Sequence, residues 1–389
     1  MDPLLMAWAR PKTRGQREPR AYHPPPPNRK RAFPRENRRI SSLYSGVMST
    51  SLAVVDDPSF DEHRPPASHP ERPERLLAAR RGTAIVTARA GRVDVAARAA
   101  TDDELVRVHH EQYVERLGRS AGRWAEWDAD TYAAPGSVDA ARRAAGGAID
   151  LVSELTSGRQ RRGVALLRPP GHHAGPEGAM GFCLLNNVAL AAAHARASGV
   201  QKVMIVDFDV HHGNGTQDVF YDDPSVLFVS LHQFPFYPGT GSRAETGAGD
   251  GRGHTINVPL SAGATDGAYA AAFDAIVAPL AAEYAPGLLL VSAGFDGHRD
   301  DPLGGMSVTE GGYRFMVESL LRAVPSTPVG VVLEGGYDLG ALEASLVASL
   351  EALADLPPEA APSLTPPSPA HLAEVSLARK AAAEFWRLP

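Results

Sequence analysis

The chain has 389 residues, which is long enough to bury a large core. It has a single cysteine, Cys183, so it can form neither an intramolecular disulfide nor a cysteine-based zinc site. No window reaches the roughly 18 uninterrupted apolar residues of a membrane span, and no apolar signal-peptide core is present, which predicts a cytoplasmic protein without a membrane partner. The net charge of -6 is uneven. Residues 1–47 carry 11 Lys and Arg against 3 acids (+8), and residues 48–389 carry 28 against 42 (-14), an acidic body that argues against nucleic acid as the main ligand.

The N-terminal segment, residues 1–47, is rich in Arg and Pro and includes four consecutive prolines at 24–27. It has neither helical nor strand periodicity, so we expect it to be a disordered basic extension. Met48 opens the ordered sequence, which favours a mis-assigned start codon over a nucleic-acid-binding or membrane-binding arm or a transit peptide.

From about residue 50 to residue 356, apolar β-rich runs alternate with Ala-rich stretches of helical period. This alternation predicts an α/β fold with an open, mostly parallel β-sheet covered by helices on both faces, in a single catalytic domain at 48–356. A Pro-rich linker and a C-terminal helix are expected at 357–389. The expected strands are 163–167, 202–208, 225–231, 288–292 and 329–333. The expected helices are 139–155, 187–197, 266–283, 309–323 and 342–353.

Four polar clusters follow these strands, at residues 168–174, 207–216, 291–298 and 333–337. Ligands in open α/β sheets bind beyond the carboxyl ends of the strands. The four clusters should therefore converge on one rim of the sheet.

The second cluster reads Asp-Phe-Asp-Val-His-His-Gly-Asn-Gly-Thr and indicates a metal site. Side chains two apart on an extended chain share a face, so Asp207, Asp209 and His211 point the same way. Asp296, at the end of a separate strand, is the natural third ligand beside Asp209 and His211. Two carboxylates and one imidazole leave positions open for water and substrate, which is typical of catalytic rather than structural zinc.

Each cluster alone also has an ordinary structural explanation. An Asp-x-Asp-x-His segment can cap a helix, paired histidines such as His172 and His173 are often solvated, and a tyrosine after two glycines, such as Tyr337, is usually a turn residue. The joint pattern favours a metal hydrolase, because four such clusters at strand ends also carry the glycines needed for close backbone approach.

The sequence resembles the zinc-dependent histone deacetylase family, particularly its class II-like members and the bacterial acetyl-lysine or acetylpolyamine amidohydrolases. The resemblance covers about residues 63–337 and implies the arginase/deacetylase-like fold. The resemblance is specific because many motifs occur in the order found in the family. They are the four clusters and the segments at 69–76, 108–117, 181–187, 230–233, 237–241 and 301–305.

The resemblance implies a role for each residue of the clusters. Asp209, His211 and Asp296 would hold one zinc ion, with ferrous iron as the alternative. His173 is similar to the general base that deprotonates a water molecule and then protonates the leaving amine. His172 is similar to its electrostatic partner.

By the same resemblance, Asp207 orients His172 and Asn214 orients His173. Asn214 is neutral where some relatives carry Asp, so His173 should be easier to deprotonate, a pattern similar to class II. Tyr337 would donate its hydroxyl to the scissile carbonyl. Because relatives with His at this position are weak on acetyl-lysine, Tyr337 argues for deacetylase activity.

The resemblance also implies a substrate tunnel. Gly181 and Phe182, opposite Tyr237, resemble narrow walls that grip an extended alkyl chain. Leu303 would lie at the tunnel mouth, and Asp130 is the candidate rim carboxylate that binds the substrate backbone.

The family carries structural monovalent cations, usually potassium, and the resemblance extends to them. The inner cation would be held by oxygens of Asp207, Asp209, His211, Ser230 and Leu231. A second would be ringed by the carbonyls of Phe220, Asp223, Val226 and His254.

The expected substrate is an acylated lysine in a protein or peptide, and an acetylated polyamine or another small amide is the alternative. A glutamate at the tunnel mouth would favour a polyamine, and Leu303 occupies that position. A binuclear manganese ureohydrolase would need a second Asp-x-Asp pair, but the third cluster has Asp296, Gly297 and His298 instead. The complete catalytic set disfavours an inactive acyl-binding scaffold. A homo-oligomer is compatible with the sequence.

Overall fold

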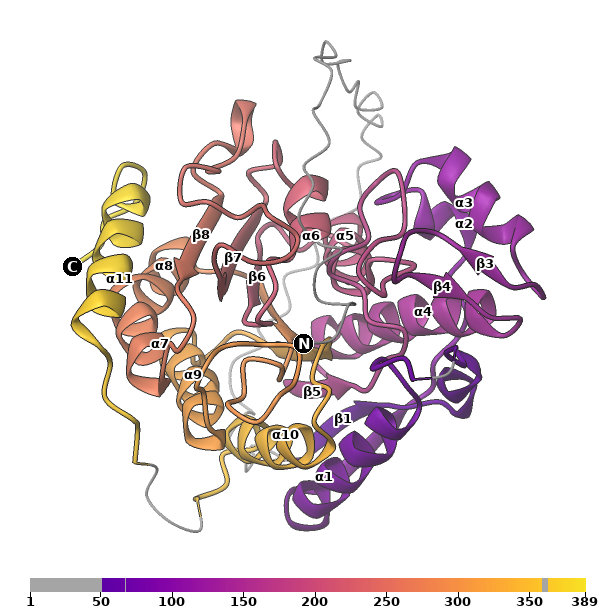
Figure 1. Ribbon diagram of the computed structural model, residues 1–389, viewed down its shortest axis with the longest axis horizontal. Helices are drawn as coiled ribbons and strands as arrows, with labels where there is room; N and C mark the ends of the chain where they lie inside the picture. Colours follow the sequence, from indigo (N-terminus) through magenta and orange to yellow (C-terminus); the bar gives the residue numbers. More distant parts are fainter. Residues whose placement is uncertain (1–50, 67, 359–362) are drawn as a thin grey trace, which may run out of the picture. The chain divides into compact units, whose positions relative to one another are not determined.

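The computed structural model describes residues 51–66, 68–358 and 363–389, and the predicted disorder of 1–47 lies outside these ranges. In the described chain, eight strands form one sheet in the order β2-β1-β5-β10-β9-β6-β7-β8 (Figure 1). Every neighbouring pair in this sheet runs parallel. The predicted α/β architecture with a mostly parallel sheet is confirmed.

The strands of this sheet are short, and nearly all residues of the inner ones are buried. A separate antiparallel pair is formed by β3 (Ala125–Glu126) and β4 (Tyr132–Ala133). The sheet consists of β1 (Leu52–Val55), β2 (Arg92–Val95), β5 (Arg162–Ala165), β6 (Val203–Asp207), β7 (Val226–Gln233), β8 (Thr255–Leu260), β9 (Leu288–Ala293) and β10 (Val329–Leu333).

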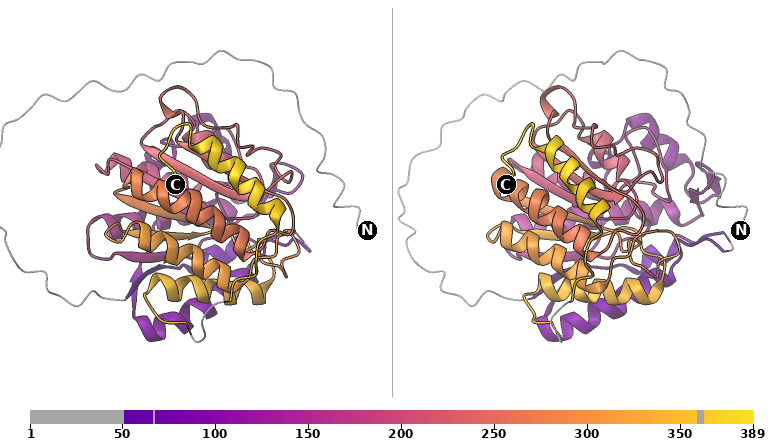
Figure 2. Two further views of the ribbon diagram at one scale, coloured as in Figure 1. Left: turned by 90° about the vertical axis from the view of Figure 1, so that its left-hand side faces the viewer. Right: turned by 60° about the vertical axis from the view of Figure 1, so that its left-hand side comes forward.

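Helices cover both faces of the sheet (Figure 1). On one face, α4 and α5 pack on each other and on β1, β5, β6 and β9. On the other, α1, α10, α9 and the α7–α8 segment lie in a row, and α11 packs along the edge strand β8 (Figure 2). The helices are α1 (Glu74–Ala90), α2 (Asp102–Leu105), α3 (Glu111–Arg119), α4 (Ser137–Thr156), α5 (Asn187–Ala197), α6 (Asn214–Val219), α7 (Asp266–Ala272), α8 (Ala278–Tyr284), α9 (Glu310–Ala323), α10 (Leu339–Leu353) and α11 (Pro369–Ala382).

The central strands explain why the five predicted strands could be recognised. Strands β6, β9 and β10 are buried along their whole length. A parallel strand covered by helices on both faces has apolar side chains on both faces. Continuous Val, Ile and Leu runs are therefore expected at the centre of the sheet, and all five predicted strands occur there.

The structure also contains elements that the apolar pattern did not predict. Strand β1 has only four residues, and β2 is an edge strand that reads Arg-Val-Asp-Val and is half exposed. Strand β8, at the other edge, includes Pro259, which argues against a strand in sequence alone. Helix α1 buries Arg75 and Thr83 beside alanines, so its apolar periodicity is weak.

One predicted helix is less regular than expected. The segment predicted as one helix over 266–283 contains α7 and α8 joined by a π-helical turn at Phe273–Val277. None of the helices in the described ranges is both long and apolar enough to cross a lipid bilayer.

Candidate metal centre

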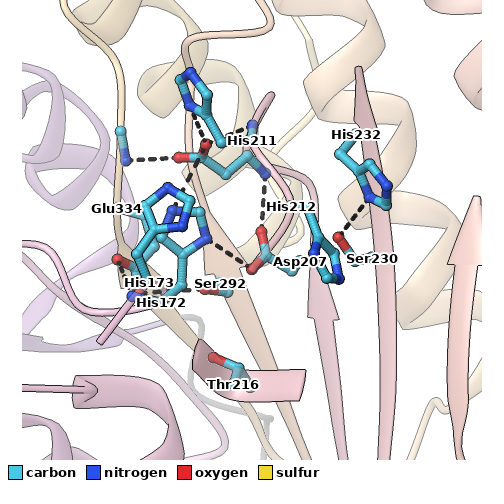
Figure 3. Close-up of polar contacts among 12 residues, drawn as sticks. His172, His173, Asp207, His211, His212, Thr216, Ser230, His232, Ser292 and Glu334 are labelled. Atoms are coloured by element: carbon cyan, nitrogen blue, oxygen red, sulfur yellow. Dashed lines mark hydrogen bonds and ion pairs between the residues drawn. The ribbon is translucent and has the colours of Figure 1, made fainter. Parts of the chain in front are cut away.

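The four polar clusters follow the carboxyl ends of β5, β10, β9 and β6, which are neighbours in the sheet. Parallel strands place these ends at one edge, so segments far apart in the sequence meet there. The predicted convergence of the four clusters on one rim is therefore observed (Figure 3).

The three predicted metal ligands form one group, in which both carboxylates are buried and His211 is partly buried. Asp209, His211 and Asp296 each offer a ligand atom, and these atoms lie within 4.8 Å of one another. His211 Nδ1 is 3.1 Å from Asp209 Oδ1 and 3.2 Å from Asp296 Oδ2. Backbone N–H groups orient both carboxylates: Val210 donates to Asp296 Oδ1 at 2.9 Å, and Gly335 donates to Asp209 Oδ2 at 2.9 Å.

The donor set fits a metal ion in chemistry and in space. Asp296 Oδ2 is buried and accepts no hydrogen bond, and the atom that faces it at 3.2 Å is Nδ1 of the candidate ligand His211. A carboxylate oxygen buried in this way is costly unless a cation binds it. A Cβ at Gly335 would lie 2.2 Å from Asp296 Oδ2 and 2.5 Å from Asp209 Oδ2. Only glycine therefore lets the backbone pass this closely behind both carboxylates. One imidazole and two carboxylates suit zinc with coordination positions left open.

A pair of histidines lies beside the metal ligands. His172 Nδ1 is 2.9 Å from Asp207 Oδ2, and His173 Nδ1 is 2.8 Å from Asn214 Oδ1. The two ring centroids are 4.0 Å apart. Each histidine thus has one nitrogen next to the residue that the resemblance assigns to it as a partner.

The surroundings of the two histidines shift their pKa values in opposite directions. Burial favours the neutral form of His172, but the carboxylates of Asp209 and Asp207 outweigh burial and raise its pKa to about 10. Burial, with the neighbouring imidazoles of His172 and His211, holds the pKa of His173 well below its usual value. His172 therefore holds a proton more strongly than a free imidazole, and His173 holds one less strongly.

Glu334 holds the loop that carries the histidines (Figure 3). Its Oε2 accepts hydrogen bonds from the backbone N–H groups of Gly171 at 2.6 Å and His172 at 3.2 Å. Ser292 donates to its other oxygen at 3.2 Å. The side chain is fully buried, and burial raises its pKa to about 7.

Tyr337 lies in the turn after β10 and is 8% exposed. The Arg75 guanidinium carbon is 4.7 Å from the centroid of its ring. Arg75 also donates to the carbonyl oxygens of Gly336, at 2.5 Å, and Glu334. The turn is thus fixed from the side of α1, which contains Arg75.

Aromatic rings line the space between Tyr337 and the histidines. Phe182 meets the Tyr337 ring edge-on at 5.8 Å, and Tyr237 meets the His173 ring edge-on at 5.2 Å. Gly181 has φ +55°, and a Cβ there would lie 2.5 Å from His173. The predicted wall residues Gly181, Phe182 and Tyr237 are therefore brought together beside the histidines.

The two predicted entrance residues lie on separate loops. Thr131 joins Asp130 to the wall, because its hydroxyl donates to the Asp130 carboxylate at 3.1 Å and accepts from the N–H of Phe182 at 3.0 Å. Leu303 is half-buried in the loop after β9, and its N–H donates to Asp301 Oδ1 at 3.0 Å.

The fourth histidine of the region, His212, faces away from the metal group. Its Nδ1 is 2.8 Å from Thr240 Oγ1, and its Nε2 is 3.1 Å from Gln217 Oε1. Both ring nitrogens are thus occupied by other partners. Ser230, predicted as a cation ligand, is paired in register with Asp207, and its hydroxyl is 2.9 Å from His232 Nδ1.

The structure adds site residues that the sequence reasoning missed. Phe236 stacks on the His211 ring with the centroids 5.4 Å apart. Glu334 and Arg75 lie within motifs that carry the family resemblance, but the sequence does not predict a role for either of them. In the sequence, Glu334 is only a charged residue after an apolar run, and Arg75 is only one of several charged residues in its segment. Neither pattern identifies the groups to which these side chains bind.

Residues 69–353 match the model of the histone deacetylase domain. Histone deacetylase 15 of Arabidopsis thaliana is 44% identical over 326 residues, which cover 82% of this chain and 59% of the relative. A probable deacetylase of Archaeoglobus fulgidus is 37% identical over 308 residues, which cover 77% of this chain and 86% of the relative.

The fold is similar to a solved structure as well. The crystal structure of the HD domain of HDA15 matches with a TM-score of 0.81 and 41% identity, covering 87% of this chain and 96% of that domain. The chain spans only 59% of the full length of histone deacetylase 15 and 63% of histone deacetylase 10, chloroplastic, of Oryza sativa.

Proposed function

Because the chain belongs to the histone deacetylase family of hydrolases, we propose that it is a zinc-dependent deacetylase that hydrolyses the amide of N-acetyl-lysine. The observation that carries this proposal is the convergence of the Asp209–His211–Asp296 group, the His172–His173 pair and Tyr337 at one rim. These are the parts that metal-assisted amide hydrolysis requires: a metal site, a proton-transfer group and an oxyanion donor.

Asp209, His211 and Asp296 would hold the zinc ion. Bound zinc supplies a water ligand of lowered pKa and polarises the substrate carbonyl. Ferrous iron is the alternative metal, since the same nitrogen and oxygen ligands suit it.

His173 is the proposed proton carrier. Its Nδ1 faces the Asn214 amide oxygen, which accepts a hydrogen bond, so in the neutral ring Nδ1 keeps the proton and Nε2 is free to accept another. Nε2 would take a proton from the attacking water and deliver it to the leaving amine. His172, held by Asp207 and with its pKa raised by the neighbouring carboxylates, would stabilise negative charge that develops nearby.

Tyr337 is the proposed oxyanion donor. Burial raises the pKa of its hydroxyl well above the usual value, so the hydroxyl remains a hydrogen-bond donor at any pH used for assay. The hydroxyl would hold the carbonyl oxygen of the substrate more strongly as negative charge develops on it.

The aromatic walls support an acylated lysine as the substrate. Phe182 and Tyr237 would enclose the extended alkyl chain, and Asp130 would bind the substrate near the entrance, where Leu303 would also lie. An acetylated polyamine is the alternative substrate, because the carboxylates of Asp128 and Asp130 lie in one turn and would attract a second ammonium group.

Three further proposals concern the rest of the chain. Residues 48–356 would form the catalytic domain, a proposal that the domain match over residues 69–353 supports.

The inner potassium ion would bind beside Asp207 and Ser230, which are paired across β6 and β7. One metal ion per chain fits the described residues, since the group around Asp209 is the one cluster of at least three His, Cys, Asp or Glu ligands found among them.

The test is a substrate panel on zinc-loaded protein. We expect turnover of an acetyl-lysine peptide, with kcat/KM at least about tenfold above that for acetylspermidine, because a tenfold ratio corresponds to about 1.4 kcal/mol of differential transition-state binding. A reversed ratio would establish the polyamine alternative. No turnover of acyl-lysine peptides or acetylpolyamines by zinc-loaded protein would reject both forms of the proposal.

A further inference from the structure

Asp301 is a buried carboxylate that no step described above uses. It lies in the loop after β9, five residues beyond the proposed ligand Asp296, and is 5% exposed. A buried carboxylate is costly unless hydrogen bonds replace its water. Its partners therefore indicate why it is there.

The partners are three backbone N–H groups from two loops. Asp301 Oδ2 accepts from Tyr337 at 2.6 Å and from Asp338 at 3.0 Å. Asp301 Oδ1 accepts from Leu303 at 3.0 Å. One side chain thus binds both the turn that carries the proposed oxyanion donor and the loop that carries Leu303.

We infer that Asp301 is a positioning residue for the deacetylation reaction: it fixes the backbone of Tyr337 so that the phenol is aimed at the substrate carbonyl, and it links that turn to the entrance loop. This inference rests on the proposed function, which assigns the reaction to Tyr337.

The two sides of the Tyr337 turn are held by different residues. Arg75 binds carbonyl oxygens of the turn, at Gly336 and Glu334, whereas Asp301 binds its N–H groups at Tyr337 and Asp338. Without the Asp301 acceptor, the N–H groups of Tyr337 and Asp338 would lose their partner, and the turn would be held only through Glu334, Gly335 and Gly336. A displacement of about 1 Å in a catalytic group can lower the rate about 100-fold.

The same carboxylate connects the turn with the entrance. Pro302, next to Asp301, and Tyr337 both line a cleft of about 750 Å³ whose other walls come from residues 61–74. A substrate group that presses on Pro302 or Leu303 would therefore act on the segment that holds Tyr337. Through its bonds to both loops, Asp301 would transmit a displacement at the entrance to the backbone that positions the hydroxyl of Tyr337.

Asp301→Asn tests the inference with little change in volume. The asparagine amide has one acceptor oxygen, so it can accept from the N–H of Leu303 or from the N–H groups of the Tyr337 turn, but not from both. Its NH₂ group, which is a donor, would then face the N–H that has lost its acceptor. We expect kcat on an acetyl-lysine peptide to fall about 10-fold to 100-fold, with KM within about 3-fold and zinc content unchanged.

A double-mutant cycle separates positioning from general damage. If Asp301 acts through the hydroxyl of Tyr337, Asp301→Asn should lower kcat less than about 3-fold in the Tyr337→Phe background. Asp266→Asn is the matched control, because Asp266 is also buried and accepts N–H bonds from Thr309 at 2.7 Å and Thr365 at 3.1 Å. The control should lower the thermal midpoint but leave kcat unchanged.

Amide hydrogen exchange provides a readout that does not need activity. Exchange at Leu303, Tyr337 and Asp338 should rise in Asp301→Asn and stay as in the wild type in Asp266→Asn. Equal kcat losses in both Tyr337 backgrounds, or unchanged exchange at these amides, would overturn the inference. If the wild type turned over no acylated lysine, the proposed function would fail, and the exchange result alone would decide whether Asp301 fixes the turn.

Discussion

Tyr337 combines a hydrophobic environment with charged neighbours. Burial raises the pKa of its hydroxyl well above the usual value, and the Arg75 guanidinium over its ring opposes part of that rise. The net effect is a protonated phenol in a site largely closed to water. Such a donor is most valuable where negative charge develops during the reaction.

The first prediction concerns this hydroxyl. Tyr337→Phe should lower kcat on an acetyl-lysine peptide by about 100-fold to 1000-fold, the usual cost of removing one oxyanion donor, while KM changes by less than about 3-fold. Steady-state kinetics on zinc-loaded protein would measure both constants.

The matched control is Tyr284→Phe, which removes a hydroxyl that donates to the carbonyl of Pro224 at 3.4 Å, outside the candidate site. Its kcat should equal that of the wild type. Comparable losses in kcat and in substrate affinity for Tyr337→Phe would show that the hydroxyl serves binding, and the assignment of Tyr337 would then be wrong.

At the scale of single residues, the sequence identified side chains whose chemistry is specific. Two carboxylates and an imidazole at strand ends, together with the other polar clusters, predict a metal site. The sequence did not identify Arg75, Glu334 and Asp301 as supporting residues, because their function depends on which backbone groups they meet. Asp301 meets Tyr337 from 36 residues away, and no local pattern encodes such a contact.

His109 joins two elements around the loop that carries the histidine pair. It lies between α2 and α3, and its Nδ1 donates to the carbonyl of Gly175 at 2.9 Å. Its Nε2 accepts from the N–H of Asn186, the N-cap of α5, at 3.0 Å. This arrangement requires a neutral ring, and burial lowers the pKa of His109 to about 4.

The second prediction is a pH dependence of stability from this histidine. The folded pKa, about 4, is below the usual 6.5 of the unfolded chain. The folded state therefore favours the neutral ring, and its stabilisation is complete above pH 6.5 and lost as the pH falls towards 4, by up to roughly 3 kcal/mol.

Urea unfolding of the wild type and His109→Gln at several pH values from 8 to 4.5 measures this effect. Glutamine stays neutral, so the variant does not lose the free energy of unfolding that the wild type loses when His109 is protonated. The difference in the free energy of unfolding between the two proteins should therefore shrink as the pH falls below 6.5. A difference that stays constant over the whole range would contradict the neutral assignment of His109.

At the scale of elements, the buried strands and the long helices could be predicted, and the edges of the sheet could not. Strands β6 and β9 have uninterrupted apolar runs because helices cover both faces. Strand β8 contains Pro259 and Asn257 and is covered along its edge by α11. Its pairing depends on tertiary contacts, which sequence periodicity does not report.

At the scale of the whole molecule, the order of the strands creates the candidate site. The chain forms β5, β6, β9 and β10 in sequence, but the sheet arranges them as β5-β10-β9-β6. This crossing brings the ends of the four strands together and explains why polar clusters separated by long helices converge. The sequence predicted that the clusters share a rim, whereas the strand order and the resulting contacts required the structure.

The acidic charge of the body also belongs to the whole molecule. Residues 48–389 have a net charge of -14, from 28 Lys and Arg and 42 Asp and Glu. A negative surface raises the local concentration of cationic ligands and lowers that of anionic ones. This charge suits substrates such as lysine-rich peptides or polyamines, in keeping with either proposed substrate.

The central claim is that one metal ion, held by Asp209, His211 and Asp296, is required for activity. The direct measurement is metal content together with turnover, after chelation and after zinc is restored, for the wild type, Asp296→Ala and the control Asp266→Ala. The wild type and the control should regain about one zinc ion per chain and their activity, whereas Asp296→Ala should regain neither. An Asp296→Ala protein that retained a full zinc ion, or a metal-free wild type that turned over its substrate, would contradict the claim.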